Sequence, residues 1–184
     1  MEKKRISQTN LQVKQEMHQA LMRLIKEKTL STISVSDLTA EAGVSRMTFY
    51  RNYHAIEDIL MEHLDEVVEE YKREETEIES TVSEEEKIFY GKKYMLHCFP
   101  FFHAHREFLD VLITGGMGDL FLAAITEYLI QKWAGKKEGT RTEVLEISAF
   151  AGAIYNMYRE WSHEGFRESP EEIAELLPDF NRLK

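Results

Sequence analysis

Hydroxyl, amide and guanidinium side chains gather in a short stretch around residue 50. Such groups hold phosphates and read base edges in the major groove of DNA. The stretch contains Ser45, Arg46, Met47, Thr48, Tyr50, Arg51 and Asn52. In a helix, Phe49 and Tyr53 share one face, whereas Met47, Thr48 and Arg51 lie on the opposite face. The spacing predicts a short helix with a buried aromatic side and a free polar side that suits a major-groove reader.

The residues before this stretch predict a second short helix and a tight turn. Ser34 and Asp37 have the spacing of a capping pair, and Leu38 falls on the buried face of the helix that they start. Gly43 provides the backbone freedom of a turn, and Ser45 is placed to cap the next helix. An ordinary helical hairpin with a solvated polar face is the alternative. The Ala-Gly-Val-Ser turn and the Thr-Phe-Tyr motif favour the DNA-reading interpretation.

Most other segments have the 3–4 residue periodicity of amphipathic helices. One stripe covers roughly residues 8–28, and another begins near Ile56 and extends to about residue 79. Capping patterns at 83–86, 140–143 and 169–172 predict three further helix starts. We therefore expect an all-α fold. It comprises an N-terminal three-helix, helix-turn-helix DNA-binding domain (1–54) and a C-terminal helical ligand-binding and dimerisation domain (55–184).

The distribution of charge separates the chain into two regions. The net charge of −10 by itself argues against a nucleic-acid partner. The first 60 residues, however, hold nine basic and seven acidic side chains, and the remainder holds 14 basic and 26 acidic ones. The densest acidic run, Asp65 to Glu86, is interpreted as a solvated helix face with its connector. Acidity thus belongs to the C-terminal region, which DNA should repel.

Between about Val13 and Leu60 the sequence resembles the TetR (TetR/AcrR-like) family of bacterial transcriptional regulators. The matching positions are Val35, Asp37, Leu38, Glu41-Ala42-Gly43-Val44-Ser45, Thr48-Phe49-Tyr50 and Tyr53. The resemblance implies a dimeric repressor that is inactivated by a small ligand held in a divergent C-terminal domain.

The resemblance also implies roles for single residues. Ser34 stands where the family has a phosphate-binding threonine, and Thr48 and Tyr50 stand where hydroxyls contact phosphates and base edges. Arg46, Met47 and Arg51 occupy the variable positions that read sequence.

Three positions depart from the family pattern. Met47 replaces a frequent glycine and would bring an apolar side chain to the groove, where it suits a thymine methyl. Asn52 replaces a common histidine. Ile56 replaces a lysine that contacts a phosphate, which predicts weaker affinity and a flatter salt dependence. Backbone amides at the start of the following helix can still hold that phosphate.

An aromatic and histidine-rich segment around Pro100 offers candidates for a ligand cavity. The candidate residues are Tyr94, His97, Phe101, Phe121 and Tyr155. The alternative, that these side chains are ordinary core, is equally favoured. A metal site at His97, His103 and His105 is disfavoured, because His103 and His105 point to different sides of a helix. We expect Cys98 to be a buried, unreactive thiol, and neither metal nor cofactor is predicted.

Two C-terminal helices have the spacing of a packing seam. We expect a four-helix interface between two copies of the chain. The predicted interface residues are Ile147, Ala151, Ile154, Tyr158, Trp161, Ile173 and Leu177. A core seam within one subunit is the alternative.

These observations favour a sequence-specific, ligand-responsive DNA-binding homodimer, with a palindromic operator and a small-molecule effector as partners. The alternative is a regulator that acts through protein contacts and binds DNA weakly or not at all, as Met47 and Ile56 suggest. An enzyme is not expected, since no catalytic set has interpretable spacing. One cysteine and no visible secretory signal fit a cytoplasmic protein, and no apolar run predicts a membrane span.

Overall fold

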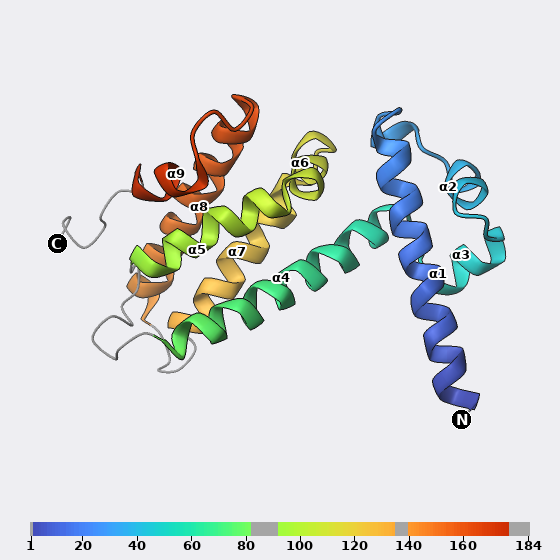
Figure 1. Ribbon diagram of the computed structural model, residues 1–184, viewed down its shortest axis with the longest axis horizontal. Helices are drawn as coiled ribbons and strands as arrows, with labels where there is room; N and C mark the ends of the chain where they lie inside the picture. Colours follow the sequence, from blue (N-terminus) through green and yellow to red (C-terminus); the bar gives the residue numbers. More distant parts are fainter. Residues whose placement is uncertain (1, 82–91, 135–139, 177–184) are drawn as a thin grey trace. The chain divides into compact units, whose positions relative to one another are not determined.

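The computed structural model describes residues 2–81, 92–134 and 140–176, and within these ranges every regular element is a helix (Figure 1). The chain divides into an N-terminal unit, Met1–Glu66, and a C-terminal unit, Val67–Lys184. The helix α4, Glu57–Glu79, contributes residues to both. This agrees with the all-α prediction.

In the N-terminal unit three helices pack in sequence order. α1 spans Glu2–Ile25, a single 3-10 turn covers Leu30–Thr32, and α2 and α3 span Val35–Glu41 and Arg46–Asn52. α1 contacts α2, and α2 contacts α3 (Figure 1). The core is formed by side chains with almost no exposed surface, contributed by α1 to α4: Met17, Ala20, Leu21, Leu38, Phe49, Ile59 and Leu60.

The first turns of α4 belong to the N-terminal unit. The sequence placed the domain boundary at residue 54, whereas the contacts divide the chain after Glu66. The physical reason is the packing of α4, since Ile59 and Leu60 are buried in the N-terminal core and Glu62 pairs with Lys14 of α1.

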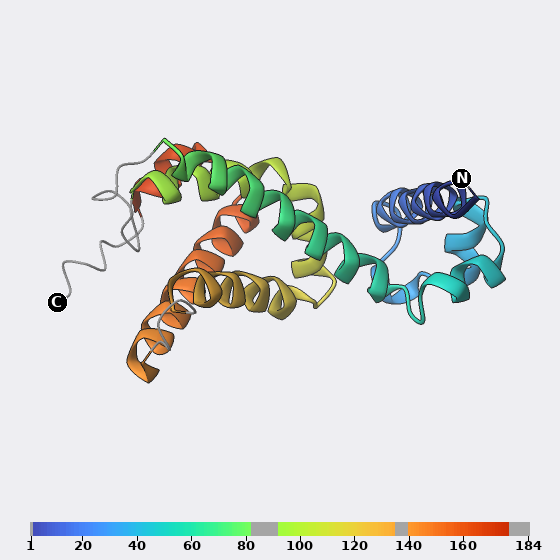
Figure 2. The same ribbon diagram turned by 90° about the horizontal axis from the view of Figure 1, so that it is seen from below.

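The C-terminal unit contains the rest of α4 and five further helices. These are α5 (Lys92–Ala104), α6 (Arg106–Thr114), α7 (Gly118–Trp133), α8 (Arg141–His163) and α9 (Pro170–Leu176). α5 packs against α9, α7 packs against α8, and α6 contacts α5, α7 and α8 (Figures 1 and 2). Large fully buried side chains such as Phe99, Leu109, Phe150 and Tyr158 fill the space between them.

Two of the predicted caps are present. Thr140 Oγ1 accepts the backbone N–H of Glu143 at 3.3 Å, and the Glu143 carboxylate accepts the N–H of Thr140 at 2.7 Å. Ser169 and Glu172 make the same reciprocal pair before α9, at 3.2 and 2.8 Å. Each pair satisfies backbone donors that the first helical turn leaves without a partner. The predicted cap at 83–86 lies outside the described residues.

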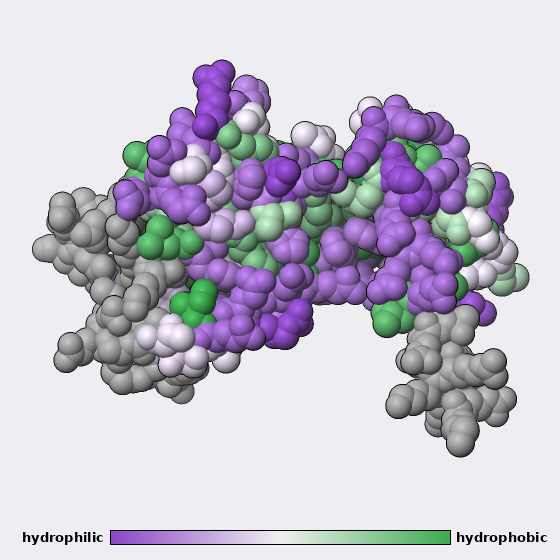
Figure 3. Space-filling view, viewed as in Figure 1, coloured by the Kyte–Doolittle hydropathy of each residue, from purple (hydrophilic) through white to green (hydrophobic). Residues whose placement is uncertain are grey.

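The surface seen in Figure 3 is largely hydrophilic, and apolar side chains form small separate patches on it. Within residues 2–81, 92–134 and 140–176, no helix has both the length and the hydropathy that a bilayer crossing requires.

Candidate nucleic-acid interface

The turn between α2 and α3 is built from local interactions. Ser34 caps α2, and its Oγ accepts the N–H of Asp37 at 3.1 Å. Gly43 has a φ of +66°, a conformation that costs other residues about 1–2 kcal/mol. Ser45 then caps α3 by accepting the N–H of Thr48 at 3.1 Å. The sequence thus specifies where α2 ends, where α3 begins and how the chain turns between them.

The helix α3 has one buried face and one exposed face. Phe49 is fully buried and Tyr53 is 6% exposed, as the spacing predicts. On the other side, Met47 is 78% exposed and Tyr50 is 57% exposed. Arg51 also lies at the surface. The ring of Tyr50 meets the edge of Phe49 at 5.2 Å between centroids, so the buried ring supports the exposed one.

Several polar groups of α3 already have partners within the unit. Arg46 donates a hydrogen bond to Ser36 of α2. The hydroxyls of Ser45 and Thr48 lie 2.9 Å apart, and the Asn52 amide donates to the Thr48 carbonyl at 2.8 Å. Met47, Tyr50 and Arg51 therefore carry the side chains on α3 most open to an approaching ligand.

Ser34 is engaged in capping rather than free for a phosphate. Its backbone N–H and its hydroxyl both donate to Asp37 Oδ2, at 3.0 and 2.6 Å. The hydrogen bonds from the Ser34 side chain and backbone, with one from Lys28, hold the pKa of Asp37 well below its usual value. A phosphate contact from Ser34 requires its hydroxyl to leave this carboxylate.

Two backbone amides just before α4 are not open to a phosphate. Ile56, which stands where the resembled family has a lysine, is 8% exposed and belongs to the core. The backbone N–H groups of His54 and Ala55 both donate to Asp58 Oδ2, at 2.7 and 3.0 Å. The bonds from Ala55 and His54 lower the pKa of Asp58, which keeps this carboxylate charged. An acidic side chain of the protein thus occupies these two amides, and a phosphate contact from the amides at the start of α4 itself stays a prediction.

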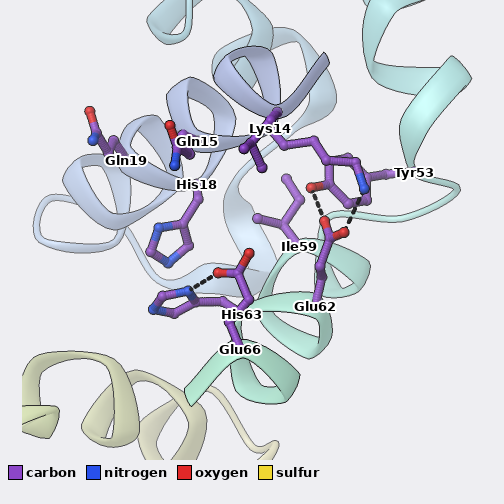
Figure 4. A pocket seen from close by; sticks show the side chains of 10 residues that line it. Lys14, Gln15, His18, Gln19, Tyr53, Ile59, Glu62, His63 and Glu66 are labelled. Atoms are coloured by element: carbon purple, nitrogen blue, oxygen red, sulfur yellow. Dashed lines mark hydrogen bonds and ion pairs between the residues drawn. The ribbon is translucent and has the colours of Figure 1, made fainter. Parts of the chain in front are cut away.

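A three-residue network holds the end of α3 in place. Tyr53, the residue after α3, donates its hydroxyl to Glu62 of α4 at 2.5 Å. Lys14 of α1 donates to the other oxygen of the same carboxylate at 2.5 Å (Figure 4). One carboxylate therefore joins α1, the end of α3 and α4, and fixes the position of the exposed face of α3.

A cavity of about 270 Å³ lies beside this network (Figure 4). His18 of α1 and His63 of α4 both line it and pack against each other with ring centroids 3.8 Å apart, and His63 pairs with Glu66 at 3.0 Å. Burial, followed by the neighbouring His63, lowers the pKa of His18 to about 4. His18 is therefore neutral at physiological pH, where its ring packs against that of His63 and joins α1 to α4.

The candidate ligand residues of the C-terminal unit form two connected aromatic groups. Tyr94 and Phe101 are buried, and His97 stacks on Tyr71 of α4 with ring centroids 5.1 Å apart. Phe121 lies 5.9 Å from Tyr155. Phe102 connects the groups, because its ring meets both Tyr71, at 6.5 Å, and Phe121, at 5.2 Å. These rings pack against one another, and a ligand role for them remains a prediction.

The three histidines of α5 and its end are not gathered at one point. His97 and His105 face Glu74 and Glu70 of α4 at 3.5 and 3.8 Å. His103 instead packs on Trp161, with ring centroids 5.4 Å apart. No group of three or more His, Cys, Asp or Glu side chains is arranged for a metal within the part of the chain that the structure describes. Cys98 is buried, and burial raises the pKa of its thiol far above the usual value, as expected for an unreactive cysteine.

The residues predicted for a dimer interface lie inside the C-terminal unit. The side chains concerned are each exposed by 6% or less: Ile147, Ala151, Ile154, Tyr158, Trp161 and Ile173. Leu177 is outside the described residues. This burial corresponds to the alternative of a seam within one subunit, since Tyr158 donates its hydroxyl to Asp110 of α6 at 3.0 Å and its ring meets Phe121 of α7 at 5.6 Å. Any contact with a second copy must use their exposed neighbours, such as Leu145 and Leu176, which are 57% and 66% exposed.

A buried ionic cluster was not anticipated from the sequence. Lys132 of α7 forms ion pairs with Glu75, and with Glu79 at 2.7 Å. Its ammonium lies 4.4 Å from the ring centroid of Tyr94 and 5.2 Å from that of Trp133. Glu75 is only 4% exposed, so the interpretation of its whole acidic run as a solvated face was wrong at this residue. The signal was available, because Glu75 continues the apolar stripe of Leu64 and Tyr71.

Burial dominates the electrostatics of Glu75. It raises the pKa of the carboxyl, and the hydrogen bond and charge of Lys132 reverse this only in part. Tyr71 lies within 3.5 Å of the same carboxylate, and burial likewise raises the pKa of its phenol.

Comparison with solved structures finds proteins of similar fold. The crystal structure of Lin0861 from Listeria innocua superimposes with a TM-score of 0.76 at 16% sequence identity, covering 97% of this chain and 92% of that chain. At this identity the likeness shows a shared fold. No protein-family model matches the sequence, and no curated protein matches it.

Proposed function

We propose that this protein is a sequence-specific DNA-binding transcriptional regulator, acting as a ligand-responsive repressor on a palindromic operator as a homodimer. The observation that carries the proposal is the two-sided character of α3. Its buried ring, Phe49, anchors a short, capped helix whose outer face presents Met47, Tyr50 and Arg51 to solvent. A protruding helix with these side chains suits the major groove, where arginine reads guanine and an apolar side chain meets a thymine methyl.

The charge of the N-terminal region favours a modest electrostatic contribution to the affinity for DNA. Nine basic and seven acidic side chains in the first 60 residues leave few phosphate contacts to one copy. Two copies that place their α3 helices about 34–36 Å apart on one face of B-DNA would double those contacts. The proposal therefore includes a dimer, and the TetR resemblance of residues 13–60 supports both the DNA module and the dimer.

The ends of α8 and α9 are the surface that we propose for the second copy. An apolar groove of about 400 Å³ lies there, lined in part by Met157, Trp161 and Leu176. Leu176 is 66% exposed, and burying it against a symmetric copy removes apolar area from water. Trp161 and Ile173 of the predicted seam line this groove, and the other seam residues contribute indirectly by holding α8 in place beneath it.

DNA protection tests the proposal directly. Footprinting of the intergenic region upstream of the gene, at low salt, should show a protected palindrome. Arg51→Ala should weaken binding by about 1–3 kcal/mol if the guanidinium contacts a base, and should flatten the salt dependence if it contacts a phosphate. Arg73→Ala, which removes an exposed arginine from α4 in the C-terminal unit, is the matched control and should bind as the unaltered protein does. Equal binding by both variants would contradict the role of α3.

A regulator that works through a protein partner is the second candidate. Two observations favour it: Ile56 lies in the core where a phosphate-binding lysine would help, and Asp58 occupies the amides beside it. A double variant, Tyr50→Ala with Arg51→Ala, separates the candidates. If regulation in vivo survives this change while DNA protection is lost, the partner is a protein. Either candidate acts in the cytoplasm.

A further inference from the structure

The ammonium of Lys132 is enclosed by groups that recognise positive charge. The carboxylates of Glu75 and Glu79 and the rings of Tyr94, Tyr128 and Trp133 surround it. The three ring centroids lie 4.4 to 6.0 Å from the nitrogen, the range in which an aromatic face attracts a cation. We call these five groups the ammonium cage. Its members come from α4, α5 and α7 of the C-terminal unit.

The cage holds more negative than positive charge. Among the described residues two carboxylates share a single ammonium, and one of them, Glu75, is almost fully buried. Removing a carboxylate from water is costly unless a cation compensates it. The cage is therefore a place where a positive charge is required, whether or not that charge belongs to the protein.

The cage is also accessible from one side. The Glu79 side chain is 37% exposed, whereas those of Glu75 and Lys132 are 6% and 13% exposed. An approaching cation thus meets a half-exposed carboxylate first and a buried one behind it. Lysine has a flexible four-carbon stem, so the Lys132 ammonium can swing from the cage to water without movement of α7.

We propose that the ammonium cage binds an organic ammonium compound, which takes the place of the Lys132 side chain. Exchange of one cation for another leaves the charge of the cage unchanged, and Lys132 regains its hydration. Quaternary or apolar-substituted ammonium groups are preferred, because they are less strongly hydrated and the rings supply cation–π contacts. Neutral and anionic analogues are rejected, since they leave Glu75 and Glu79 without compensation.

The exchange also changes how α4 is held. Lys132 is covalently part of α7 and pairs with two carboxylates of α4, so it ties these helices together. A free ammonium compound satisfies the same carboxylates without making that tie. We expect the loss of this tie to change DNA binding. That expectation rests on the function proposed above, whereas binding of the compound does not.

Choline and its neutral isostere 3,3-dimethylbutan-1-ol form a matched pair of probes. We would titrate each into the wild-type protein and into Lys132→Ala, with sodium chloride balancing ionic strength, and follow melting temperature and heat of binding. Lys132→Ala empties the cage, so its melting temperature should fall and choline should restore it. Choline should bind this variant about tenfold or more tightly than wild type, because Lys132 no longer competes. Lys72→Ala removes a half-buried lysine of α4 outside the cage and should behave as wild type.

A further change localises the binding. Glu75→Gln added to Lys132→Ala leaves only the half-exposed Glu79 in the cage, so it should greatly reduce the difference between choline and the neutral alcohol. Equal effects of choline and the alcohol on Lys132→Ala would overturn the proposal, as would choline binding that Glu75→Gln leaves unchanged. If Lys132→Ala does not fold, Lys132→Gln takes its place. Absence of saturable choline binding to both wild type and Lys132→Gln would then also overturn the proposal. Choline binding that leaves DNA protection unchanged would refute only the link to the proposed function.

Discussion

Two lysine–glutamate ion pairs hold α4 against neighbouring helices, one in each unit. The two pairs have the same types of side chain but different surroundings. In the N-terminal unit Lys14 pairs with Glu62, and Tyr53 donates to the same carboxylate. In the C-terminal unit Lys132 pairs with Glu75, and Tyr71 lies within 3.5 Å of that carboxylate. Each lysine also lies over a tyrosine ring, at 5.4 Å for Lys14 and 4.4 Å for Lys132.

The two pairs differ in how far their side chains are exposed to solvent. The side chains of Lys14 and Glu62 are 28% and 38% exposed, whereas those of Lys132 and Glu75 are 13% and 6% exposed. For Glu62, burial pushes the pKa upward, but the hydrogen bonds from Lys14 and Tyr53 and the charge of Lys14 outweigh it and lower the pKa. For Glu75, burial wins and the pKa is raised. The same partners thus stabilise a charged carboxylate near water and only partly compensate one in the interior.

The largest difference should appear when the lysines are removed. Lys132→Ala leaves a buried carboxylate without its cation, and we expect a loss of about 3–5 kcal/mol in the free energy of unfolding. Lys14→Ala should cost about 0.2–1 kcal/mol, because water replaces its partner. Urea unfolding measures both. Trp133 and Trp161 lie in the C-terminal unit, so tryptophan fluorescence follows that unit and far-UV ellipticity follows both.

A double variant, Lys132→Met with Glu75→Leu, is the control for this prediction. Replacing both charges by apolar groups should recover most of the lost stability, since no buried charge remains. Similar losses for Lys14→Ala and Lys132→Ala would show that burial does not distinguish the two pairs.

The pH dependence should have opposite signs at the two glutamates. The folded pKa of Glu62 lies below the ordinary 4.5, so its contribution is present above pH 4.5 and is lost as the pH falls through the folded value. The folded pKa of Glu75 lies above 4.5, so the folded state holds this proton more tightly and loses stability as the pH rises from 4.5. Unfolding of Glu62→Gln and Glu75→Gln across acidic pH, each relative to wild type, measures the two slopes. Slopes of the same sign would break the comparison.

Removing the tyrosine hydroxyls should cost more stability in the N-terminal unit than in the C-terminal unit, which is the opposite of the order expected for the lysines. Tyr53→Phe removes a hydrogen bond of 2.5 Å and should cost about 0.5–1.5 kcal/mol. Tyr71→Phe removes a contact of 3.5 Å and should cost less. Because Tyr53 follows α3 directly, Tyr53→Phe should also weaken operator binding, whereas Tyr71→Phe should not. Urea unfolding together with a DNA-binding titration checks both statements.

Salt should have the smallest effect and should act on one pair only. Raising ionic strength screens charges near water over about 10 Å or less and screens buried charges much less. The coupling energy of Lys14 with Glu62, from a double-mutant cycle, should shrink between low and high salt. That of Lys132 with Glu75 should change little. Equal salt sensitivity would indicate that water reaches Lys132.

Local features of the N-terminal unit could be predicted from the sequence because short-range interactions decide them. Ser34 with Asp37, Gly43 and Ser45 act within a few residues of one another, and the four-residue spacing of Phe49 and Tyr53 defines the buried face of α3. Each of these expectations depends on helix geometry and capping alone. The chemical types on the exposed face of α3 follow from the same register.

The role of a charged residue depends on which side chains pack against it. The sequence alone does not show these tertiary neighbours. Glu75 was grouped with solvated acids because its neighbours in the chain are acidic, but α7 covers it with Lys132. Asp58 was not recognised as the acceptor of the His54 and Ala55 amides. The period along α8 marked a packing seam correctly, but only the arrangement of helices decides whether a seam faces the same chain or another copy.

The sequence by itself determined that the chain is helical, where α2 begins and ends, where α3 begins, and which side chains α3 turns outward. These properties follow from backbone geometry and from contacts a few residues apart. Only the tertiary structure decided that Glu62 stays near water while Glu75 is buried, and that Lys132 sits among three aromatic rings. The cause is long-range packing, since the free energy of a charge depends on every group that replaces water around it.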